Sequence, residues 1–203
     1  WEANYAAGQG SVGSFAAKYP GTLGNSIKVS MCDSATYEKS LTGTMTAPLT
    51  AVLGVGTAFT TEAHVGGLLY TTSGALVGTV LSITDDTHLT LTANAAATLS
   101  GAAAKMYWEY HDLFDGTPGT SDYATRFGGS SDEVHIAVID NLGQITGTPG
   151  TVLELFPRAS KASDARTEQG AANYYATVLQ GSQYAWWMDH PTNVTGTAAW
   201  GST

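Results

Sequence analysis

The segment EVHIAVIDNLGQITGTPGTVLELFPRAS, residues 133–160, constrains the fold more than any other part of the chain. Val134, Ile136 and Val138 alternate with residues that are mostly apolar as well, which predicts a strand buried on both faces. A partner strand is expected to return at residues 151–155. The residues expected to shape the connecting turn are Asp140, Gly143, Gly147 and Gly150.

The segment that follows this hairpin carries a helical pattern. Apolar side chains within residues 168–180 recur at the spacing of an amphipathic helix, and Gly181 stands where a C-terminal glycine cap is expected. A short strand is predicted in SQYAWWMDHP, and an earlier one is predicted over residues 25–39. The order strand, hairpin, helix, strand indicates an α/β or α+β domain.

The middle of the chain has a different composition. Between Lys39 and Lys105 there is no lysine or arginine, and threonine, alanine, glycine, leucine and valine dominate. Short alternating runs surround the turn pair Asp85-Asp86, which predicts a β-hairpin. We expect residues 43–104 to form a small all-β barrel or sandwich inserted into a host domain made of residues 1–42 and 105–203.

The stretch KYPGTLGNSIKV concentrates backbone signals just before a strand. Pro20 and Gly21 form one turn signal, and Gly24 and Asn25 form a second. Glycine adopts positive φ freely and asparagine tolerates it, so these residues are expected to direct the next strand into the sheet. The stretch therefore predicts architecture rather than catalysis.

The charge balance excludes some partners. The chain has 8 basic and 17 acidic residues, a net charge of −9. Nucleic acids and anionic membrane surfaces need a basic face, so neither is an expected partner. No apolar run approaches the roughly 18 residues of a membrane span. The chain opens on Trp1, from which we expect it to be a piece of a longer protein.

No pattern for catalysis, metal binding or a cofactor stands out. The lone cysteine, Cys32, follows apolar residues and is interpreted as a small buried hydrophobe. Asp189-His190 could orient a distant serine, but the nucleophile pattern of hydrolases is missing. The histidines show no metal-ligand spacing, so we interpret them as structural or surface residues. They are His64, His88, His111, His135 and His190. We expect no enzyme activity, no metal and no cofactor.

The aromatic residues gather in two short runs, MYWEY and YAWWM. Core packing is one interpretation. The other is that they anchor a neighbouring chain, because tryptophan and tyrosine dominate the energetics of protein interfaces. On the second interpretation the candidate subunit-interface residues are Trp108, Tyr184, Trp186 and Trp187.

KYPGTLGNSIKV resembles a signature of the sheath proteins of contractile, myovirus-type bacteriophage tails. GTPGTSDYA, DEVHIAVIDNLGQITGTPGTVLELF and ASDARTEQGAANYYATVLQGSQYAWW are similar to later segments of the same family, in the same order. The resemblance covers residues 1–40 and 105–203. Residues 43–104 depart from it and look like a small β module found on various phage structural proteins.

The resemblance implies a mixed-sheet domain of subtilisin-like topology, without a matching catalytic triad. It also implies a virion protein, made in the host cytoplasm, that assembles helically with copies of itself around the tail tube. Its partners would be the tube protein and the baseplate, and its contraction would drive the tube through the host envelope. This fragment by itself is expected to be monomeric.

Two other functions fit the residues less well. One is a surface-displayed carbohydrate-binding or adhesion module, with the threonine-rich segment as its binding part. The other is a hydrolase that uses His190.

Overall fold

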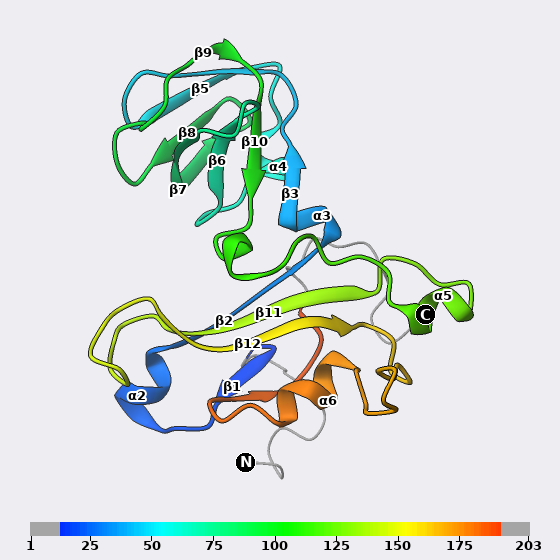
Figure 1. Ribbon diagram of the computed structural model, residues 1–203. Coiled ribbons are helices and arrows are strands. Elements are labelled where there is room, and N and C mark those ends of the chain that lie inside the picture. Colours follow the sequence, from blue (N-terminus) through cyan, green and yellow to red (C-terminus); the bar gives the residue numbers. More distant parts are fainter. Residues whose placement is uncertain (1–12, 192–203) are drawn as a thin grey trace. The chain divides into compact units, whose positions relative to one another are not determined.

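The computed structural model describes residues 13–191. The chain divides into two compact units, which are treated separately (Figure 1). Unit 1 holds the segments up to Ser34 and from Thr117 onward, and unit 2 is Ala35–Gly116. Unit 2 is therefore longer at both ends than residues 43–104, because strands from each flank complete its sheet.

Unit 1 contains a three-stranded antiparallel sheet in the order β12-β11-β2. Its strands are β2 (Ile27–Asp33), β11 (Glu133–Asp140) and β12 (Thr151–Ser160). All eight residues of the central strand β11 are buried, as its alternating branched side chains predict. The predicted hairpin of β11 and β12 is confirmed.

A second, two-stranded antiparallel sheet in unit 1 joins β1 (Phe15–Ala17) to β13 (Ala185–Trp187). Three short helices complete the unit: α2 (Gly21–Asn25), α5 (Asp122–Arg126) and α6 (Tyr175–Gln180). The core forms where α6 packs against the sheets, with Tyr175, Leu179 and Ile136 fully buried.

Unit 2 wraps eight strands around one apolar core, in the order β3-β10-β6-β7-β8-β5-β4-β9. The long strand β7 pairs with β6 through its first half and with β8 through its second half, with register shifts that bend it. The predicted hairpin at Asp85-Asp86 is confirmed as the turn between β7 and β8. The strands are β3 (Glu38–Ser40), β4 (Thr44–Ala47), β5 (Ala51–Val55), β6 (Leu68–Thr71), β7 (Leu76–Asp85), β8 (His88–Leu91), β9 (Leu99–Ala102) and β10 (Ala104–Tyr107). Two helical turns, α3 (Ser34–Tyr37) and α4 (Phe59–Glu62), and a 3₁₀ turn at His111–Leu113 accompany them.

The chain is an α+β protein, and the strand ladders among residues 13–191 are antiparallel. The prediction of a single strand over residues 25–39 is wrong. β2 ends at Asp33, which pairs with Val134 near the start of β11. The residues after Asp33 have no strand beside them to pair with, and the chain turns into α3.

The helix expected over residues 168–180 is also wrong in its first half. Gly170 has φ +85, and the backbone of Thr167 pairs with Ala171 in a tight turn, so α6 begins only at Tyr175. Gly181 follows the helix as expected but has φ −74 rather than a left-handed conformation. The helix end is held instead by Lys18, whose Nζ donates to the carbonyls of Gln180 and Ser182.

Candidate functional site

The two glycine-rich turn segments of unit 1 meet at Ser26, the residue after α2. The Ser26 hydroxyl donates to a carboxylate oxygen of Asp140, 114 positions later in the chain. The same hydroxyl oxygen accepts the backbone N–H groups of Leu142 (3.1 Å) and Gln144 (3.2 Å). The Ser26 carbonyl accepts the N–H of Asn141 at 2.6 Å. One serine therefore fastens α2 to the tip of the β11–β12 hairpin.

Asp140 organises the other side of this junction. Its Oδ2 atom accepts the N–H groups of Ile145 (3.0 Å) and Thr146 (2.7 Å) and the Thr146 hydroxyl (2.8 Å). Burial opposes ionisation of the Asp140 carboxyl, but hydrogen bonds from Ser26, Thr146 and Ile145 outweigh it, so the pKa of this carboxyl lies well below its ordinary value. The ionised carboxylate thus holds the loop in one conformation.

The predicted turn residues divide by backbone conformation. The positive φ expected of Gly21 is confirmed, at +70. Gly143, Gly147 and Gly150 of the hairpin loop also have positive φ, at +71, +86 and +80. Gly24 and Asn25 instead lie inside α2, and Pro20 is its N-cap with φ −79, so the expectation of positive φ at residues 24 and 25 is wrong. Glycine is required at position 24 for space, because a Cβ there would lie 2.1 Å from the carbonyl oxygen of Tyr19.

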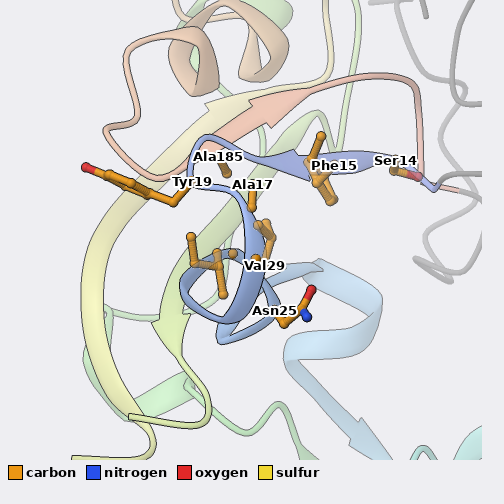
Figure 2. A pocket seen from close by; sticks show the side chains of 11 residues that line it. Ser14, Phe15, Ala17, Tyr19, Asn25, Val29 and Ala185 are labelled. Carbon is orange, nitrogen blue, oxygen red and sulfur yellow. The ribbon is translucent and has the colours of Figure 1, made fainter. Parts of the chain in front are cut away.

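A pocket of about 410 Å³ lies between β1, α2 and β2. Figure 2 shows Ala17 and Val29 between the backbones of β1 and α2, with Tyr19 at the rim pointing outward. The remaining lining residues are Ser14, Phe15, Ala16, Gly21, Gly24, Asn25, Ile27 and Ala185. None of the described residues that line the pocket has a charged side chain.

Three of the four candidate interface aromatics lie on or beside β13, next to this pocket. Trp186 is 41% exposed, and the Nζ of Lys18 lies 3.9 Å from its ring centroid. Tyr184 contacts Tyr19 at the rim, with ring centroids 6.0 Å apart. Trp187 turns inward, and its Nε1 donates to the Tyr175 hydroxyl at 3.0 Å.

The fourth candidate, Trp108, lies in unit 2 and is only 4% exposed. Its ring packs with Tyr110 and Phe114, and its backbone N–H donates to the Tyr37 carbonyl at 3.0 Å. Trp108 therefore packs inside the protein, as the core-packing interpretation predicts. Local alternation in MYWEY could not reveal this, because either face of a short strand can be the buried one.

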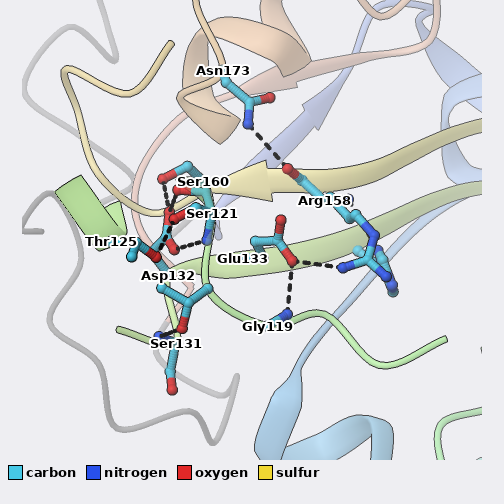
Figure 3. A network of polar contacts seen from close by, with 11 residues as sticks. Gly119, Ser121, Thr125, Ser131, Asp132, Glu133, Arg158, Ser160 and Asn173 are labelled. Carbon is cyan, nitrogen blue, oxygen red and sulfur yellow. Dashed lines mark hydrogen bonds and ion pairs between the residues drawn. The ribbon is translucent and has the colours of Figure 1, made fainter. Parts of the chain in front are cut away.

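A polar network holds α5 at the other end of unit 1 (Figure 3). The Asp132 carboxylate accepts the N–H (2.7 Å) and hydroxyl (2.8 Å) of Ser121 and the hydroxyl of Ser160. Ser121 in turn caps α5 by accepting the Ala124 N–H at 3.1 Å. Immediately after α5, Phe127 is 65% exposed.

Neither the joint at Ser26 nor the exposure of Phe127 was predicted from the sequence. The glycine- and proline-rich composition of residues 115–132 favours a loop, although Ser121-Asp122 is a helix-start signal and Gly128 is a stop signal. No local signal identifies Ser26, because its role comes from a carboxylate 114 positions away.

The histidines that could take part in acid–base chemistry are engaged in separate interactions. His190 Nδ1 shares a hydrogen bond with the Tyr175 hydroxyl (2.6 Å), and His88 Nδ1 contacts the Asp85 carboxylate (2.8 Å). His135 Nδ1 accepts the backbone N–H of Arg158 (3.1 Å). Across residues 13–191, no group of three or more histidine, cysteine, aspartate or glutamate side chains could hold a metal ion. The described part of the chain also contains no helix long and apolar enough to cross a membrane.

Cys32 is fully buried, as expected, and burial raises the pKa of its thiol above the ordinary value. Comparisons of the chain with protein-family models, curated proteins and solved structures found no match.

Proposed function

We propose that the chain is a structural subunit of a contractile tail sheath. The observation that carries this proposal is the joint between Ser26 and Asp140. It connects the two segments on which the sequence resemblance rests most heavily, KYPGTLGNSIKV and DEVHIAVIDNLGQITGTPGTVLELF. A motif pair that is fastened by buried hydrogen bonds supports a role in shaping the subunit rather than in chemistry.

Unit 1 would be the sheath core, with the subtilisin-like topology that the family implies. Copies would assemble helically around the tail tube, contact the baseplate, and shift between an extended and a contracted lattice. A subunit of such a lattice needs surfaces that repack without stranding buried charges. A chain in which 12% of the residues are charged suits this requirement. The proposed location is therefore the virion.

Unit 2 would be a display module carried by the sheath core. Between Lys39 and Lys105 it has no lysine or arginine, and the strands β4 and β5 expose threonine and aliphatic side chains such as Thr46, Leu53 and Val55. The β3–β10 pairing brings its two ends together, which is the arrangement an insertion needs to leave its host intact.

The test is electron microscopy of the protein expressed from its complete coding sequence. We expect hollow helical cylinders or stacked rings of uniform diameter. A matched preparation of Asp140→Asn, which removes one acceptor from the joint, is expected to give fewer or shorter cylinders. A wild-type protein that stays monomeric at high concentration, alone and with its tube protein, would contradict the proposal.

A further inference from the structure

His135 is a buried histidine on the central strand β11, with 1% of its surface exposed. Its Nδ1 atom accepts the backbone N–H of Arg158, and the two nitrogens are 3.1 Å apart. An imidazole nitrogen accepts a hydrogen bond only when it carries no proton, so this contact requires the neutral ring with its proton on Nε2. The folded chain therefore selects one protonation state of His135.

The donor, Arg158, lies in an irregular part of β12. The ladder of β11 and β12 shifts register around His135, where residues 157 and 158 of β12 oppose a single residue of β11. Arg158 has φ +51, a left-handed conformation that residues other than glycine rarely adopt. Such a conformation persists only where neighbouring contacts fix it, and the hydrogen bond to His135 is one of those contacts.

Arg158 also connects the bulge with the segment by which the chain re-enters unit 1, at Thr117. Its guanidinium pairs with the Glu133 carboxylate at 2.8 Å (Figure 3). The same Oε2 atom of Glu133 accepts the N–H of Gly119 at 2.8 Å, and the Glu133 N–H donates to the Gly119 carbonyl at 3.1 Å. A continuous series of contacts thus runs from the His135 ring to Gly119.

The titratable groups around His135 make a second ring proton unfavourable while these contacts last. Glu133 lies two residues earlier on the same side of the sheet, and Cys32 lies directly opposite on β2. The charged residues on the other side of β11, beside Val134, are paired with each other: Asp33 and Lys161. Among these groups Glu133 is the acid on the side of His135, and its carboxylate already binds the Arg158 guanidinium. A protonated His135 would gain that carboxylate only by drawing it away from Arg158 and Gly119.

We propose that His135 is an acid-sensitive switch, whose protonation breaks the bond to the Arg158 N–H, opens the bulge of β12 and releases Gly119 from Glu133. In the open form Nδ1 is available to a proton, which histidine binds near pH 6.5, so the open form binds one more proton than the closed form below that pH. The closed form therefore loses stability as pH falls below about 6.5, by up to tenfold per pH unit and about thirtyfold at pH 5. The switch does not depend on the sheath function.

The test is nuclear magnetic resonance of the 203-residue chain, labelled with ¹⁵N and titrated from about pH 7.5 to about pH 5. The two ring nitrogens of His135 differ strongly in chemical shift in the neutral ring and become nearly equivalent in the imidazolium, so they report its protonation directly. Hydrogen-exchange protection factors, corrected for the intrinsic effect of pH, report opening at the Arg158 and Gly119 amides. We expect an unprotonated Nδ1 at the higher pH. At the lower pH we expect about thirtyfold less protection of these two amides relative to the β7 amides of unit 2.

Three variants separate the switch from a general effect of acid. In His135→Gln the amide oxygen can accept the Arg158 N–H at every pH, so the loss of protection should disappear. His88→Gln removes an exposed histidine of unit 2 and should behave like the wild type. Arg158→Gly keeps the N–H and tolerates positive φ but removes the guanidinium, so Gly119 should no longer respond to His135.

The wild-type titration decides the proposal even if His135→Gln does not fold. An imidazolium ring at about pH 7.5, or equal protection of the Arg158 and Gly119 amides at both ends of the titration, would overturn it. The same loss of protection in a folded His135→Gln variant would overturn it as well. Because Asp140 loses its contribution only below about pH 4, that carboxyl does not interfere in this range.

Discussion

Replacing Gly24 by alanine tests the packing of α2 directly. Glycine inside a helix costs about 1 kcal/mol relative to alanine, so local propensity alone makes the substitution favourable. The added Cβ would lie 2.1 Å from the Tyr19 carbonyl oxygen and 3.1 Å from the Ala17 Cβ, and the first of these is a backbone atom. Overpacking typically costs 1–3 kcal/mol, and a backbone clash lies at or above the upper end. The expected net result is a loss of about 2 kcal/mol, and Gly24→Val should lose more.

Hydrogen–deuterium exchange measures this loss in each unit separately. A change of about 2 kcal/mol corresponds to roughly thirtyfold faster exchange of the β11 amides if they exchange through unfolding of unit 1. The amides of β7, in unit 2, serve as the internal reference. The matched control is Gly119→Ala, whose Cβ would meet nothing closer than 3.8 Å, and which should leave β11 unchanged or slightly more protected. Equal protection of β11 in both variants would refute the steric argument.

Three further outcomes follow from buried groups of unit 1. The pKa of Asp140 is lower in the folded than in the unfolded protein, so its contribution to stability is present above about pH 4 and is lost as pH falls further. When unfolding by acid is followed by circular dichroism, the stability of Asp140→Asn should therefore decline less steeply than that of the wild type. Lys161 and Asp33 form an ion pair at 2.9 Å, with 1% and 3% of their side chains exposed. Lys161→Ala leaves the Asp33 carboxylate buried without its partner and should lower the free energy of urea unfolding by about 3–5 kcal/mol. A decrease below about 1 kcal/mol would show that the pair is hydrated. Cys32 should react with iodoacetamide only after unfolding, and its labelling rate should rise with urea in parallel with β11 exchange; labelling in seconds without urea would contradict its burial.

The elements predicted correctly from sequence are those whose signals are local. The β11–β12 hairpin follows from alternating branched residues and a glycine-rich turn, and the β7–β8 hairpin follows from the turn at Asp85-Asp86. The predicted start of α6 was wrong because the apolar spacing continues upstream through Gly170, where positive φ is incompatible with a helix. Periodicity does not reveal that interruption.

The candidate site could be predicted only in part. The residues of the two turns were identified, but their meeting depends on β2 pairing with β11 across a long intervening segment. The pocket likewise requires β1 to pair with β13, from the two ends of the described chain. Burial of Trp108 and exposure of Phe127 are properties of the packed fold, and an aromatic side chain in a short segment is compatible with either.

The pairing of β3 with β10 has a consequence for the order of folding. Asp33 of β2 pairs with Val134 of β11 about 100 residues later, and closing so long a loop costs conformational entropy. If unit 2 folds first, the pairing of Glu38 with Tyr107 already holds the two flanking segments together, so the loop that remains to be closed is only roughly 30 residues long. The saving is about 1 kcal/mol in chain entropy. Early folding of unit 2 would thus speed the pairing of β2 with β11 in unit 1.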